Sequence, residues 1–140
     1  MLVMWTRNLS VGVKRLDEDH KRLLSVVHDL HYASQNVSAE GTVDAEEIEF
    51  ALHRLENYFK YHCLEENRLM DKTAYPDREA HKLEHTGFLA MIQEKKQRFI
   101  GSSKPEDAIE LMQFMYDWMT NHINVTDKKF GEHLNTKGIT

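Results

Sequence analysis

The sequence predicts an all-α protein, an up-down-up-down antiparallel four-helix bundle that follows an extended N-terminal segment. The chain has 140 residues with only two prolines and six glycines, and its β-branched residues never alternate as they do in a half-buried strand. Instead, four segments repeat apolar residues at steps of three and four, which is typical of amphipathic helices. Because short loops join these segments, we expect an antiparallel bundle in a single domain over 1–140.

The first two helices are expected over about residues 17–37 and 44–71, after an N-terminal loop over 1–16. Leucines and valines form the apolar stripe of the first helix. The second begins at Asp44, which Glu47 follows three residues later, and this spacing is typical of a capping box.

The last two helices are expected over about residues 76–100 and 104–130. Pro76 stands in the first turn of the third helix, where proline is tolerated. Gly101 is a candidate for the left-handed residue that follows the end of this helix. Ser103 precedes the fourth helix and has a glutamate three residues later, which again fits a capping box.

The composition argues against several classes of function. A net charge of -5 without a cluster of basic residues disfavours a nucleic-acid partner. No apolar run approaches the roughly 18 residues that a membrane span requires, and the N-terminus shows no secretory signal. The single cysteine, Cys63, cannot form an intrachain disulfide, which fits a reducing compartment. A cytoplasmic location is therefore expected.

The nine histidines point to a metal site, and their spacing supports one. Each predicted helix carries at least one histidine in its apolar stripe. Two side chains four residues apart share a helix face and can bind one metal ion or adjacent ions. Because the helices alternate in direction, six such side chains fall at one end of the bundle, where burial without a cation would leave them poorly solvated. They are His20, His62, Glu66, His81, His85 and His122.

Two enzyme classes compete for these residues. The segment HKLEH over 81–85 matches the H-x-x-E-H signature of a zinc hydrolase, with Glu84 as the base, but this reading leaves the other histidines unexplained. A ferritin-like oxidase requires Glu-x-x-His pairs, and no histidine in this chain has a glutamate three residues before it. Neither class is favoured, and we do not expect an enzyme.

Four motifs resemble those of the bacterial hemerythrin family. Trp5 and the segment SVGV precede them, and their order and spacing agree from about residue 5 to residue 130. Each motif alone is weak, whereas the set is highly specific. The motifs are LDEDH ending at His20, HCLEE from His62 to Glu66, HKLEH from His81 to His85, and HINVTD from His122 to Asp127.

The resemblance implies a non-haem di-iron protein that binds O2 reversibly as a hydroperoxide at one iron, for carriage, storage or delivery. Three histidines would hold one iron and two the other, with an oxo or hydroxo group and two carboxylates as bridges. The iron with two histidines keeps an open position for O2, NO or another small anion. Manganese and zinc also suit such ligands. Carried over by position, the ligands are His81, His85 and His122 on one iron, His20 and His62 on the other, and Glu66 and Asp127 as bridges.

The last two of these positions predict a local irregularity. His122 and Asp127 are five residues apart, which on an ideal α-helix turns their side chains about 140° away from each other. If both bind the same centre, the fourth helix must be distorted or broken between them.

The resemblance also implies an oxygen pocket, with two unusual residues in it. Cys63 stands where a phenylalanine is common, and Asn124 where a leucine is common. We expect the amide of Asn124 to lie near bound oxygen, where it either donates a hydrogen bond to the hydroperoxide or admits water that speeds autoxidation, and the second effect is favoured. The pocket positions are Leu23, Cys63, Trp118, Met119, Ile123 and Asn124.

Several histidines and carboxylates stand outside the predicted centre. We expect a core position for His31, because it lies too far along its helix from His20 to share a metal. Asp17 and Glu84 are candidates either for helix capping or for holding an imidazole N–H. Surface positions are expected for His28, His53 and His133.

A second function shares the same centre. Related domains occur alone and fused to signalling modules, so an oxygen- or redox-sensing domain that regulates an attached or partner effector is the alternative to oxygen carriage. Carriage is favoured if the chain is a whole protein, and sensing if it is part of a longer one.

Overall fold

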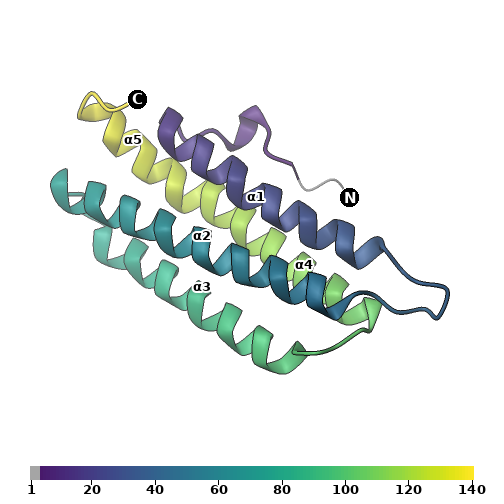
Figure 1. Cartoon of the computed structure of the whole chain (residues 1–140). Coiled ribbons are helices and arrows are strands. Elements are labelled where there is room, and N and C mark those ends of the chain that lie inside the picture. Colours follow the sequence, from purple (N-terminus) through teal and green to yellow (C-terminus); the bar gives the residue numbers. More distant parts are fainter. Residues whose placement is uncertain (1–3) are drawn as a thin grey trace.

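The computed structural model describes residues 4–140, which form helices and loops without any strand. Figure 1 shows the long helices lying side by side and alternating in direction, which confirms the predicted all-α bundle. Residues 1–3 of the predicted N-terminal loop lie outside the described part. The elements are η1 (Arg7–Leu9), α1 (Lys14–Gln35), α2 (Ala45–Lys72), α3 (Arg78–Phe99), α4 (Pro105–Asn121), the π-helical turn η2 (His122–Asp127) and α5 (Lys128–Thr136).

The apolar stripes of the helices meet in one continuous core. α1 packs against α2 and α4, and α2 packs against α3. Burying each large apolar side chain stabilises the fold by about 1.5–3 kcal/mol relative to leaving it exposed. Of residues 4–140, no helix combines the length and the apolarity needed to cross a membrane. The largest fully buried side chains include Leu16, Leu24, Leu30, Leu55, Phe59, Phe88, Ile92, Leu111 and Met115.

The helix ends follow the predicted signals in part. The side chain of Asp44 accepts hydrogen bonds from two backbone N–H groups in the first turn of α2, as a capping residue does. Gly101 has a φ of 74°, which confirms it as the left-handed residue after α3. The predicted cap at Ser103 is wrong, because Lys104 holds the N-cap position of α4 and makes no side-chain cap.

Three helix boundaries differ from the prediction. α3 begins at Arg78 instead of residue 76, so Pro76 lies before the helix and the prediction that it stands in the first turn is wrong. α1 begins at Lys14 instead of residue 17, and it follows a short 3-10 helix within the predicted loop. The fourth helix runs past residue 130 to Thr136, as α4, η2 and α5 in succession. The π turn between His122 and Asp127 is the predicted distortion, and it leaves the helix continuous.

The segment before α1 is tied to α5 and to α1 itself. Asp17 accepts hydrogen bonds from the Ser10 hydroxyl at 2.6 Å and from the Val11 N–H at 2.9 Å. Gly131 of α5 is buried against Val11, so close that a Cβ atom on Gly131 would lie 1.9 Å from the Val11 carbonyl oxygen. The fold therefore needs a glycine at position 131 to let the two backbones meet.

We predict that Gly131→Ala destabilises the protein by about 1–3 kcal/mol, because the added methyl must push the N-terminal segment off α5. Gly87→Ala is the matched control, since nothing lies within 4 Å of a Cβ built on that helical glycine. Alanine at position 87 should stabilise α3 by about 0.5–1 kcal/mol. Chemical denaturation followed by circular dichroism measures both changes, and equal stability of the two variants would contradict the close contact.

Candidate metal centre

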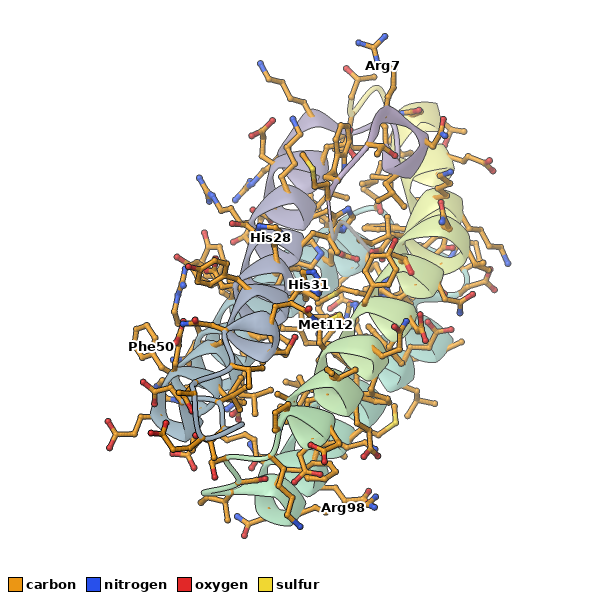
Figure 2. All side chains as sticks on the ribbon, turned by 90° about the vertical axis from the view of Figure 1, so that its right-hand side faces the viewer. Arg7, His28, His31, Phe50, Arg98 and Met112 are labelled. Atoms are coloured by element: carbon orange, nitrogen blue, oxygen red, sulfur yellow. The ribbon has the colours of Figure 1, made fainter. Side chains whose placement is uncertain are left out.

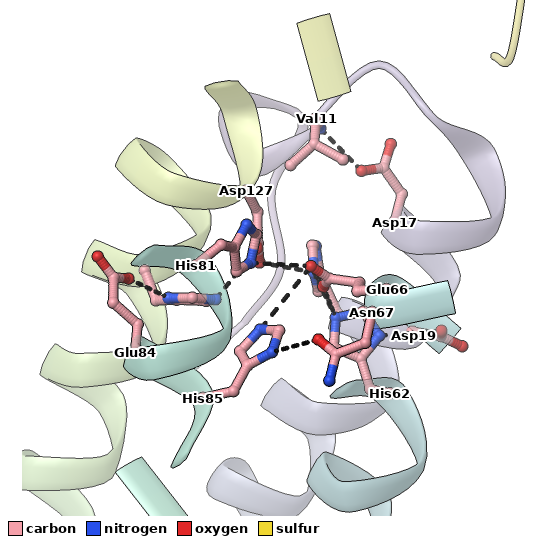
Figure 3. Close-up of polar contacts among 12 residues, drawn as sticks. Val11, Asp17, Asp19, His62, Glu66, Asn67, His81, Glu84, His85 and Asp127 are labelled. Atoms are coloured by element: carbon pink, nitrogen blue, oxygen red, sulfur yellow. Dashed lines mark hydrogen bonds and ion pairs between the residues drawn. The ribbon is translucent and has the colours of Figure 1, made fainter. Parts of the chain in front are cut away.

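Seven buried polar side chains meet at the end of the bundle where α1 and α3 begin (Figure 3). α1 carries one of them near its start, and the π turn η2 that follows α4 carries two. α2 and α3 each supply a pair four residues apart. Every one of them is at most 3% exposed. They are His20, His62, Glu66, His81, His85, His122 and Asp127, so the structure brings together all the ligands expected from the sequence.

The two oxygens of Glu66 face different histidines. Its Oε1 atom contacts Nε2 of His62 and lies 3.8 Å from Nε2 of His20. Its Oε2 atom lies 3.1 Å from Nε2 of His81 and 3.9 Å from Nε2 of His85. One carboxylate thus reaches a histidine pair from α1 and α2 on one side and the pair of α3 on the other.

Asp127 spans the same two sides. Its Oδ2 atom lies 3.0 Å from Nε2 of His20, while its Oδ1 atom lies 3.0 Å from Nε2 of both His81 and His122. The π turn makes this possible, because its hydrogen bonds run from i to i+5 and so place residues five apart on one face.

Within residues 4–140, several polar atoms that point into the cluster have no hydrogen-bond partner. Buried polar atoms are normally hydrogen bonded, and an unpaired buried carboxylate is costly. Imidazole nitrogens and carboxylate oxygens are the donors that iron, zinc and manganese accept, so a cation fits this donor set. Among the described residues, the inward atoms without a hydrogen bond are both Glu66 oxygens, both Asp127 oxygens, and Nε2 of His81, His85 and His122.

The donors fall into two overlapping groups, in each of which the ligand atoms all lie within 4.8 Å of one another. Asp127 belongs to both groups, which is the arrangement expected for a pair of neighbouring ions. The groups are His81, His85, His122 and Asp127, and His20, His62, Glu66 and Asp127.

Hydrogen bonds at Nδ1 orient three of the histidines. A hydrogen bond at Nδ1 fixes the tautomer and leaves the Nε2 lone pair free to face the centre. Glu84 therefore accepts the Nδ1–H of His122, as predicted for one of its two candidate roles, and it also accepts a hydrogen bond from Thr126. The pairs are His62 Nδ1 with Asp19 at 3.0 Å, His85 Nδ1 with Asn67 at 3.3 Å, and His122 Nδ1 with Glu84 at 2.7 Å.

Charge in the centre is balanced between carboxylates and imidazoles. Burial alone raises the pKa of Glu66 and Asp127, but the surrounding histidines hold both pKa values well below the usual range. Burial alone lowers the pKa of His62 and His81, yet the carboxylates raise these pKa values to about 10 and about 9. A bound cation would replace the protons on these two imidazoles as the balancing positive charge.

Most of the expected oxygen-pocket residues are buried, but Asn124 is exposed. The π turn points His122, Ile123 and Asp127 inward and leaves position 124 facing outward. The prediction that its amide lies near bound oxygen is therefore wrong, and the expectation of faster autoxidation loses its basis. Leu23, Cys63, Met119 and Ile123 are at most 5% exposed, and the Trp118 ring stacks on His122 with 4.6 Å between centroids.

The remaining predicted residues take varied positions. Asp17 binds the N-terminal segment instead of an imidazole. His53 is exposed as predicted, whereas His28 and His133 are half-buried and not on the surface. His31 is also half-buried, on α1 at the middle of the molecule (Figure 2), which only partly fits the predicted core position.

Two further residues take part in the centre without having been predicted from the sequence, Asp19 and Asn67. Each directly neighbours a member of the cluster in sequence, one before His20 and one after Glu66. Their polar character beside those residues was the available signal, but each orients a histidine of a different helix. That relation depends on how the helices pack.

Comparisons with known proteins agree with this geometry. A family model described as the hemerythrin HHE cation binding domain matches residues 11–134. The bacteriohemerythrin of Pseudomonas aeruginosa (strain LESB58) is 31% identical over 125 residues, covering 89% of this chain and 76% of that protein. The bacteriohemerythrin of Stenotrophomonas maltophilia (strain R551-3) is 28% identical over 140 residues, covering 96% and 85%. A crystal structure of wild-type hemerythrin matches with a TM-score of 0.76 and 29% identity, covering 96% of this chain and 98% of that one.

We predict that Glu84→Gln weakens metal binding by about 10- to 100-fold, because it removes the charged acceptor that orients His122. Glu79→Gln is the matched control, since Glu79 is an exposed carboxylate near the start of the same helix. It should leave the affinity unchanged. Competition with a coloured chelator measures the metal affinity of each variant. A similar loss of affinity in both variants would show that Glu84 acts only through surface charge.

Proposed function

Because the chain belongs to the hemerythrin family, we propose that it binds O2 reversibly at a centre of two iron ions. One observation carries the proposal: two buried carboxylates each present one oxygen to either half of a five-histidine cluster. Such a carboxylate is suited to bridge two ions, whereas a single ion would leave half of these donors unused. Oxygen binding and not catalysis is the activity that this centre supports best.

The contacts divide the ligands between the two ions. We assign His81, His85 and His122 to one ion and His20 with His62 to the other, with Glu66 and Asp127 between them. Two ligand atoms bound to one ion at about 2.1 Å and at right angles lie about 3 Å apart. The contacts of 3.0 Å that Asp127 makes with Nε2 of His20, His81 and His122 match this spacing.

The unequal number of histidines supports one open position. An ion at His20 and His62 would have one protein ligand fewer than its neighbour, so that O2, NO or a small anion could bind there. Two ferrous ions held by these residues would supply two electrons, and a hydroxide between them one proton, so that O2 could be bound as a hydroperoxide and released again as O2.

Apolar side chains close to the ligands in sequence are buried. Leu23 follows His20 by three residues and Cys63 follows His62 directly, and both are buried. Met119 and Ile123, on either side of His122 in sequence, are each 1% exposed. Apolar side chains stabilise no separated charge near bound oxygen, which disfavours its loss as free peroxide. Use of the same centre by a sensor, with an attached or partner effector, is the second candidate, and it stays a prediction.

The test is metal analysis combined with absorption spectroscopy. The iron-loaded, reduced protein should develop near-ultraviolet and visible bands in air and lose them when oxygen is removed. His81→Ala should abolish the bands and lower the iron content, because His81 touches both carboxylates. His53→Ala, which removes an exposed histidine, should behave as wild type. A wild-type protein that binds two irons and shows no reversible band in air would refute oxygen binding.

A further inference from the structure

An open cavity of about 590 Å³ lies between α1 and α2, on the outer side of the metal centre. Its volume falls in the range of about 300–1,000 Å³ that is typical of small-molecule sites. Phe50, Tyr58 and Tyr61 of α2 line it and are 63%, 42% and 56% exposed. Figure 2 shows Phe50 pointing away from the bundle. Three aromatic rings thus face one hollow on the surface, and none of them is buried in the core.

Two guanidinium groups and the carboxylate of Asp19 lie beside these rings. Arg22 of α1 and Arg54 of α2 both line the cavity, and together with Tyr58 they also line a smaller hollow next to it. Arg54 donates a hydrogen bond to Asp29 at 2.9 Å. Among residues 4–140, Arg22 forms no ion pair, so its guanidinium is available to an outside anion.

The inner wall of the cavity leads to the metal centre. His62 and Leu23 form part of it, together with Asp19, whose carboxylate accepts the Nδ1–H of His62 at 3.0 Å. The uncharged ring of an occupant that lies beside Asp19 would therefore be one hydrogen bond away from a residue that we assign as an iron ligand, while its anionic group would lie at Arg22. This relation rests on the proposed function, whereas the cavity itself does not.

We propose that this cavity is a binding site for a planar aromatic anion, such as an aromatic carboxylate, sulfonate or phosphate. The rings of Tyr58 and Phe50 offer faces and edges on which a planar group can stack. A guanidinium binds an anionic oxygen through a fork of N–H donors, which favours an acidic ligand over a neutral one of the same shape. The apolar floor at Leu23 suits the ring and not the charged group.

The probe for this site is 8-anilinonaphthalene-1-sulfonate, a planar aromatic anion whose fluorescence rises on leaving water. Titration of the folded, full-length chain should show saturable binding to one site. Tyr58→Ala should weaken it about tenfold, which corresponds to about 1.4 kcal/mol. Arg22→Gln should weaken it by a similar factor, and N-phenyl-1-naphthylamine, which lacks the sulfonate, should bind wild type and Arg22→Gln equally.

Leu83→Ala is the matched control, because Leu83 is a 70% exposed apolar residue on α3, outside the cavity. It should bind the probe as wild type does. Should Tyr58→Ala fail to fold, as judged from its helical circular dichroism, Phe50→Ala replaces it. The proposed site is overturned if binding is not saturable, or if Tyr58→Ala and Leu83→Ala lose the same affinity for the probe. Its preference for anions is overturned if Arg22→Gln binds the probe with unchanged affinity. Because fluorescence reports the cavity and not the iron, the result is independent of whether the chain binds O2.

Discussion

Two carboxylates buried among five imidazoles are the constraint on which the rest of this structure depends. Glu66 and Asp127 are at most 1% exposed, and an isolated charge at that depth would be strongly destabilising. The imidazoles that compensate them come from all four helices. The axial alignment of the helices is therefore fixed by this charge balance as well as by apolar packing, and the same balance creates a set of donors for cations.

The π turn η2 reconciles that centre with the geometry of a continuous helix. A regular α-helix could direct His122 inward or Asp127 inward, but not both. Insertion of a wider turn is rare and tends to occur at functional sites. Its consequences extend along the chain, because it turns Asn124 outward and sets the direction of α5, which then meets the N-terminal segment at Gly131.

The sequence predicted those features that depend on helix periodicity alone. The bundle and the clustering of His62, Glu66, His81 and His85 follow from steps of four residues on helices that alternate in direction. The role of Asp127 as a ligand was predicted only from the resemblance to a family, because the helix face on which Asp127 lies cannot be derived without the π turn. The exposure of Asn124 could not be predicted for the same reason. Asp19 and its cavity were missed because they depend on the contact between α1 and α2, which sequence spacing does not encode.

The most direct test of the two-ion centre is anomalous X-ray diffraction from crystals of the iron-loaded protein, measured at the iron absorption edge. This structure predicts two anomalous peaks per chain. One should lie at Nε2 of His81, His85 and His122, the other at Nε2 of His20 and His62, with Glu66 and Asp127 touching both. A single peak, or iron bound away from these side chains, would contradict it.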